Sequence, residues 1–220
     1  MSLHLTRAIE GLKKQILGLS AKVEESVFKA FKALQNNDKA LALEVIKYDE
    51  KIDALEVEIE EQCLETLALH QPVAIDLRFI VAILKINNDL ERIGDFAVSM
   101  AQRANALSDI LPSNNAKINF EDIARKVHDI LHLSLEAFVN LDEELAKKVI
   151  ASDHEIDRIN KEIHLHVLEE CKKSPEKIES LTLQLSVSRN LERMADHATN
   201  IAEDVIYMIR GKIVRHKKID

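Results

Sequence analysis

Four pairs of acidic residues share one spacing, with three residues between the two acids of each pair. They are Asp49–Asp53, Glu91–Asp95, Asp153–Asp157 and Glu192–Asp196. On a helix, this spacing places both carboxylates on the same side, about one turn apart. Carboxylate oxygens are the ligands that hard cations such as Mg²⁺, Ca²⁺, Mn²⁺ and iron prefer. The eight acids are therefore candidate metal ligands.

The acid pairs recur at fixed offsets in two halves of the chain. Asp153 follows Asp49 by 104 residues, and Glu192 follows Glu91 by 101 residues. Every pair borders the apolar stripe of its segment on the same side, so antiparallel packing of the two segments in one half would bring four carboxylates together. The alternative is ordinary solvated acids, partly paired with Arg92 and Arg193. Repetition of all four pairs favours the shared metal site.

Histidine residues are secondary candidates. His128 and His132 have the spacing of two ligands on one helix face, but no acidic motif accompanies them in the sequence, so we predict solvated or packing side chains. His164 lies two turns beyond the acid pair of its segment and could extend that cluster. His197 follows the last acid of the fourth pair but points elsewhere on a helix.

The composition predicts an all-α protein. Only 4 Gly and 3 Pro occur in 220 residues, too few for the frequent turns of a sandwich or barrel. Aromatic residues make up 4%, while Ala, Leu, Glu, Lys and Ile are abundant, which is typical of long helices. The net charge of −8 argues against a nucleic-acid partner, since phosphate contacts need a basic face.

Apolar residues recur at steps of three and four, which predicts long helices of roughly 30–35 residues. Breaks near 35–38, 70–72, 111–115, 140–142 and 174–175 divide the chain into six such helices. We predict Asp38 as an N-cap and Pro72 in the first turn of the third helix. The chain therefore reads as two pseudo-repeated antiparallel three-helix bundles, residues 1–112 and 113–220, joined near Pro112 or sharing a face.

The remaining sequence features predict a cytoplasmic protein. No run of 18 apolar residues is present, and the first residues lack the pattern of a signal peptide. Cys63 and Cys171 stand alone inside helical segments, so we expect them to pack rather than react. The basic residues at 212–218 are expected to be a solvated terminus.

Four segments resemble the PhoU family of bacterial phosphate-uptake regulators. Residues 90–95 read Leu-Glu-Arg-Ile-Gly-Asp, and residues 191–196 read Leu-Glu-Arg-Met-Ala-Asp. Residues 71–78 read Gln-Pro-Val-Ala-Ile-Asp-Leu-Arg, and residues 196–203 read Asp-His-Ala-Thr-Asn-Ile-Ala-Glu. The resemblance extends over nearly the whole chain, with His70 where the family pattern leads us to expect a basic residue.

The resemblance implies a fold, partners and a role. Such proteins are cytoplasmic pairs of three-helix bundles that commonly form homodimers. They restrain the phosphate-starvation response when phosphate is plentiful, linking a phosphate ABC transporter ATPase to a membrane sensor histidine kinase, so membrane association is peripheral. Their acid motifs bind metal ions, in some members as multinuclear iron clusters, with Mn or Mg as alternatives. The implied ligands are the eight acids named above.

Three other functions are compatible with clustered acids. A ferritin-like di-iron oxidase needs Glu-x-x-His on two helices, and no Glu here is followed three residues later by His. A metal-dependent hydrolase would need an enclosed pocket, and the sequence shows neither a nucleophile motif nor a Gly-rich phosphate loop. A scaffold with solvated acids differs from the regulator only in binding no metal. The regulator is the favoured interpretation.

Overall fold

The computed structural model describes residues 3–110 and 118–212. This part of the chain contains six α-helices and one short 3₁₀ turn, and no strand. The α-helices are α1 (Leu3–Asn36), α2 (Lys39–His70), α3 (Ala74–Ile110), α4 (Glu121–Asn140), α5 (Glu143–Lys173) and α6 (Ile178–Arg210), with the 3₁₀ turn η2 at Pro175–Lys177. The predicted all-α fold with six helices is confirmed.

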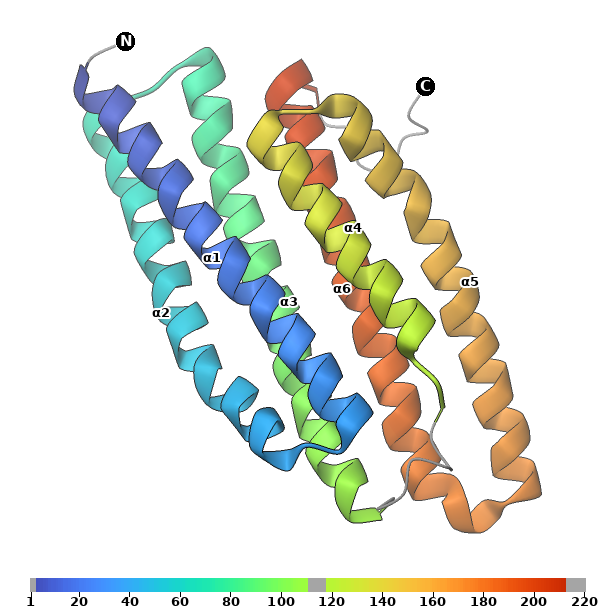
Figure 1. The fold of residues 1–220 in the computed structure, drawn as a ribbon. Coiled ribbons are helices and arrows are strands. Elements are labelled where there is room, and N and C mark those ends of the chain that lie inside the picture. The colour runs from blue at the N-terminus through green and yellow to red at the C-terminus, as the bar shows by residue number, and fades with distance from the viewer. Residues whose placement is uncertain (1–2, 111–117, 213–220) are drawn as a thin grey trace.

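The helices form two three-helix units that share a face (Figure 1). Helices α1, α2 and α3 pack together, as do α4, α5 and α6, and neighbours in the sequence run in opposite directions. Helices α3 and α6 make the most extensive contact between the units, and α2 and α5 lie at the two outer edges. Helices α1 and α4 lie on the same side of this central pair. The predicted boundary at residue 112 lies outside the described residues.

Helix boundaries follow local chemistry with one correction. The Asp38 and Asp142 carboxylates each accept the backbone N–H three residues on, confirming the predicted N-cap and showing its repeat in the second unit. The prediction that Pro72 lies in the first turn of α3 is wrong. The helix begins at Ala74, because Gln71 and Ala74 both have positive φ. The chain therefore leaves the helical conformation at Gln71 and enters α3 only at Ala74.

Helix α4 is shorter than predicted. It has 20 residues, whereas its counterpart α1 has 34. The predicted boundary leaves only residues 113–140 for this helix, and the stretch before Glu121 contains three Asn residues, which favour turns over helix interiors.

One continuous apolar core runs through both units. Fully buried side chains of the first unit include Leu12, Ile16, Ile52 and Ile86. In α6, the apolar residues spaced three or four apart are likewise buried: Val187, Leu191, Met194, Ala198, Ile201, Val205 and Met208. Cys63 is fully buried, and burial raises the pKa of its thiol to about 12, while Cys171 is partly buried against the core. The described part of the chain has no helix long and apolar enough to cross a membrane.

Polar contacts between α3 and α6 follow a local two-fold pattern. Adding the 101-residue offset exchanges the two helices, and the interacting pairs exchange with them. The matched hydrogen-bonded pairs are Asp89–Asn200 with Asn190–Ser99, and Lys85–Asp204 with Arg103–Ser186. A duplicated three-helix unit packed against its own copy explains this arrangement, because a two-fold axis makes each contact occur twice.

The two units differ at one position of close helix packing. Gly94 on α3 faces Ile52 and Asp49 of α2, and its counterpart on α6 is Ala195. A Cβ at Gly94 would lie 3.4 Å from Ile52 Cγ2 and 3.8 Å from Asp49 Oδ1, which are ordinary contacts.

We therefore expect Gly94→Ala to stabilise the protein by about 0.5–1 kcal/mol, because glycine weakens a helix interior by that amount. Urea unfolding followed by circular dichroism measures the change. A loss of stability would show that α2 and α3 approach too closely here for a methyl group.

Candidate metal-binding surface

Three acids of the second unit converge on one point of the surface. Asp153 and Asp157 on α5 and Asp196 on α6 each offer a carboxylate oxygen, and these oxygens all lie within 4.8 Å of one another. Helix α5 supplies two of them because the residues are one turn apart, and antiparallel α6 brings the third alongside. The predicted convergence of acids from two helices therefore occurs here.

Like charges raise the proton affinity of this cluster. Burial raises the pKa of Asp196 to about 6, with repulsion from Glu192, Asp153 and Asp157 adding to it. The pKa of Glu192 is also raised, first by burial and then by Asp157. The fourth predicted acid thus lies close enough to interact with the other three. An added cation would relieve this repulsion.

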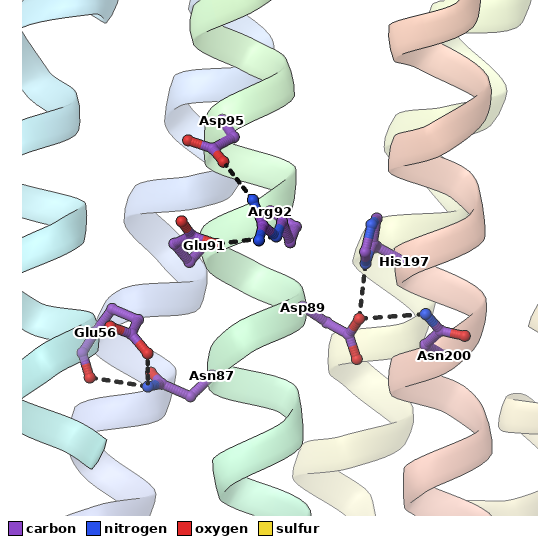
Figure 2. Close-up of polar contacts among 8 residues, drawn as sticks. All are labelled: Glu56, Asn87, Asp89, Glu91, Arg92, Asp95, His197 and Asn200. Atoms are coloured by element: carbon purple, nitrogen blue, oxygen red, sulfur yellow. Dashed lines mark hydrogen bonds and ion pairs between the residues drawn. The ribbon is translucent and has the colours of Figure 1, made fainter. Parts of the chain in front are cut away.

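The first unit holds the equivalent acids in a different state. Burial raises the pKa of Asp49 to about 6, with contributions from Asp53 and Asp95, so these acids of α2 and α3 interact. Among the described residues, only the second unit brings three acids within 4.8 Å of one another. In the first unit Arg92 intervenes, since its Nη1 donates to Asp95 Oδ2 at 3.1 Å and its Nε lies 3.6 Å from Glu91 Oε2 (Figure 2). The arginine pairing that the alternative interpretation invoked is therefore present in the first unit.

A pair of polar residues beside each cluster was missed in the sequence. In the first unit, Asn87 Nδ2 donates to the Glu56 carbonyl at 2.8 Å and to Glu56 Oε1 at 3.0 Å (Figure 2). In the second unit the equivalent residues are Asn160 and Ser188, and the Ser188 hydroxyl donates to Asn160 Oδ1 at 2.6 Å. Both pairs join the acid-bearing helices one turn from the clusters. These positions repeat at the same offsets as the acid pairs, 104 residues for Glu56 and Asn160 and 101 residues for Asn87 and Ser188, so the repeat could have identified them.

The secondary histidine candidates take no part in the converging group. His197 Nδ1 lies 2.7 Å from Asp89 Oδ1, so the ring points toward α3 and away from Asp196, as predicted (Figure 2). His164 is partly buried on α5, and its ring is not part of the group of side chains that meet within 4.8 Å. Within the described residues, the cluster of Asp153, Asp157 and Asp196 therefore offers a cation oxygen ligands alone.

The arrangement suits the binding of a hard cation. Several carboxylates at the surface, with pKa values raised by one another, match the oxygen ligands and negative charge that Mg²⁺, Mn²⁺ or iron require. A ferritin-like centre would need a histidine on each of two helices, and the converging acids have none among them. These side chains have the donor chemistry that a hard cation requires.

The raised pKa values predict how the metal-free protein responds to pH. Asp49 and Asp196 titrate near 6 when folded and near 3.8 when unfolded, so the folded state binds more protons between these values. Stability should therefore fall as the pH rises through this window. Thermal unfolding in chelator, from about pH 5 to about pH 7, should show a declining melting temperature.

A double variant serves as the control for this pH effect. Asp49→Asn with Asp196→Asn removes both titrating groups while keeping side-chain size, so its pH profile should be flatter. Glu143, whose pKa Arg210 holds at about 2, changes stability only up to about its unfolded pKa of 4.5, which is below the pH range of this experiment. Parallel profiles for the two proteins would contradict the prediction.

Comparison with known proteins identifies the family. The PhoU domain model matches residues 16–104 and 120–205. The chain is 38% identical over 217 residues to a phosphate-specific transport system accessory protein PhoU homolog of Aquifex aeolicus, covering 99% of this chain and 98% of the relative. It is 36% identical over 216 residues to the homolog of Pseudomonas putida, covering 98% and 84%.

Two solved structures share the whole fold. The crystal structure of PhoU from Pseudomonas aeruginosa superimposes with a TM-score of 0.91 at 35% identity, over 94% of this chain and 99% of that one. The phosphate transport system regulatory protein PhoU from Streptococcus pneumoniae gives a TM-score of 0.85 at 28% identity, over 96% and 99%. The duplicated helices and paired acids thus occur in a chain that belongs to the PhoU family.

Proposed function

We propose that this protein is an accessory protein of a phosphate transport system that restrains phosphate uptake and the phosphate-starvation response. Similarity over nearly the whole chain to relatives named as phosphate-specific transport system accessory proteins supports the proposal. In this proposal it acts in the cytoplasm, as a homodimer, between the ATPase of a phosphate ABC transporter and a sensor histidine kinase. Its association with the membrane is then peripheral, through those partners, and it catalyses no reaction itself.

We further propose that the two acid clusters bind metal, with iron favoured and Mn²⁺ or Mg²⁺ as alternatives. The convergence of Asp153, Asp157 and Asp196 within 4.8 Å supports this assignment, since an uncompensated cluster of carboxylates is costly. Glu192 completes the second set, and Asp49, Asp53, Glu91 and Asp95 form the first.

Metal binding could control partner binding through surface charge. An empty cluster presents several negative charges, whereas an occupied cluster is close to neutral, and this difference favours different partner surfaces. In the first unit, Arg92 would have to leave Glu91 and Asp95 before these carboxylates could bind a cation. The two units are therefore expected to load metal at different concentrations.

The test separates the regulatory role from the metal. A strain lacking the gene for this protein would carry a phosphate-starvation promoter reporter and receive either the wild-type chain or the variant Glu91→Gln, Asp95→Asn, Glu192→Gln, Asp196→Asn. We expect the wild type, but not the variant, to restore repression in high phosphate. Failure of the wild type would overturn the regulatory role. Normal repression by the variant would overturn only the metal switch.

A further inference from the structure

A histidine pair on α4 lies outside the carboxylate clusters. The rings of His128 and His132 are nearly parallel, at 3° between planes, with centroids 6.4 Å apart. The two residues are one helical turn apart, so both imidazoles project from one side of α4. Helix α4 lies with α1 on the opposite side of α3 and α6 from the viewer of Figure 2, where both form the background. The pair therefore lies on a different helix from the acids drawn there.

Each ring of the pair has an acid nearby. Asp129 follows His128 in the chain and places its Oδ1 atom 3.9 Å from His128 Nδ1, whereas His132 meets an acid from another helix. Glu24 on α1 places its Oε1 atom 3.1 Å from His132 Nδ1, although the two residues are 108 apart in the chain. A carboxylate can only accept this hydrogen bond, so Nδ1 carries a proton, and in the neutral imidazole Nε2 then has a free lone pair. Histidines that ligate metals are commonly held in this way by a carboxylate on the other ring nitrogen.

The surroundings of the pair leave it accessible to an ion. The His128 and His132 side chains are 44% and 62% exposed, and Glu24 is 25% exposed. His128 also borders a groove between α1 and α4, lined by Phe28, Phe31 and Ala124 among others. The nearby cation Arg125 is engaged by Asp122 at 2.7 Å, which offsets its charge beside the pair.

We propose that His128 and His132 form a site for a divalent d-block cation such as Zn²⁺, Ni²⁺ or Cu²⁺, with Glu24 as the orienting carboxylate. Two imidazole nitrogens select these ions, whereas the all-oxygen clusters select harder ones. The remaining coordination positions are open to water. Since Glu24 belongs to the first unit and the histidines to the second, an ion bound here strengthens a link between the two units.

Copper provides a probe that distinguishes the two kinds of site. One equivalent of Cu²⁺ is added to the full chain, and electron paramagnetic resonance reports whether nitrogen atoms ligate it. Every protein carries His4→Gln, so that this exposed imidazole near the terminus cannot compete. We expect splitting from two imidazole nitrogens in the parent protein, and its loss in the variant His128→Gln with His132→Gln.

Matched variants make the result specific. His70→Gln with His166→Gln removes two other imidazoles and should leave the nitrogen signal unchanged. Amide substitution of Glu91, Asp95, Glu192 and Asp196 should also leave it unchanged, so this site and the proposed carboxylate sites can fail separately. Glu24→Gln should keep the ligands but weaken Cu²⁺ binding about 10–100-fold, the usual effect of losing such a partner.

Two results would overturn the proposal. One is a parent spectrum with oxygen ligands alone. The other is an unchanged nitrogen signal after both His128 and His132 are replaced, provided circular dichroism shows that the variant is folded. Competition of Zn²⁺ against the bound Cu²⁺ then compares the two ions at the same site.

Discussion

Replacing Glu91, Asp95, Glu192 and Asp196 by their amides is expected to abolish stoichiometric binding of hard cations. Each cluster loses the two acids contributed by α3 or α6, and amides are weaker ligands for iron or Mn²⁺ than carboxylates are. Elemental analysis of protein purified without an affinity tag or chelator measures this, with wild type and variant prepared in parallel. The wild type should contain metal near whole-number stoichiometry, and the variant should contain none.

The same variant should be more stable than the wild type when both are metal-free. Like charges one helical turn apart cost roughly 0.2–0.5 kcal/mol per pair, and the substitutions neutralise two pairs outright and relieve the others. We expect a gain of about 1 kcal/mol in urea unfolding with chelator present. Such a gain would also show that the variant is folded, so that its loss of metal could not be attributed to unfolding.

An equivalent acid pair elsewhere provides the control for metal binding. Glu61 and Glu65 have the same spacing on α2, but both are exposed and lie outside the cluster that converges. Glu61→Gln with Glu65→Gln should therefore bind as much metal as wild type. Equal metal content in all three proteins would refute the carboxylate sites, and no metal in any would leave the acids as a solvated surface.

The second large effect concerns the contact between the two units. Asp89 on α3 is buried, and its Oδ1 atom accepts hydrogen bonds from His197 Nδ1 at 2.7 Å and Asn200 Nδ2 at 3.2 Å (Figure 2). His197→Phe removes the closer donor and leaves a buried carboxylate with one amide partner. Without this partner, the desolvation of the buried carboxylate is no longer compensated. We therefore expect the free energy of unfolding to fall by about 2–3 kcal/mol.

A second substitution should reverse most of that loss. The local two-fold pattern matches Asp89 with Asn190 and His197 with Phe96, so the double variant Asp89→Asn with His197→Phe copies the other half of the contact. The uncharged amide can bond to Asn200, and the new phenyl ring would lie against Phe96, where the imidazole now lies with ring centroids 5.6 Å apart. Urea unfolding of the two single variants and the double variant gives the coupling free energy.

The coupling distinguishes a specific pair from general packing. Partial recovery in the double variant would show that His197 stabilises the protein mainly through its hydrogen bond to Asp89. Additive losses would instead mean that the imidazole acts through packing, for example against Phe96. Metal analysis on the same proteins then shows whether this contact, which adjoins Glu91 and Asp196, affects the loading of the clusters.

Local patterns made the helices predictable. The spacing of apolar residues predicted α3 and α6, and these residues are buried in the structure. The aspartates before α2 and α5 are N-caps in the structure. The start of α3 was misplaced because positive φ at Gln71 and Ala74 is not apparent from their residue types. Neither residue is Gly or Asn, the types that mark such conformations.

The candidate site was predictable only in part. The spacing of each acid pair is fixed by one helix, so pairing within Asp153–Asp157 followed directly from the sequence. Whether acids of two helices meet depends on the rotation and register of those helices against each other, which periodicity does not fix. Arg92 bonding to Asp95 is likewise a rotamer choice made in the folded protein.

By itself, the sequence determined the all-helical class, the repeat of a three-helix plan and the spacing of the acids, because each depends on residues close together in the chain or on fixed offsets. Only the tertiary structure decided that the units share a face through α3 and α6, that Asp89 meets His197, and that Glu24 reaches His132. These contacts join residues more than 100 positions apart. They are set by the way two finished helical surfaces pack, and no periodicity within one helix specifies that.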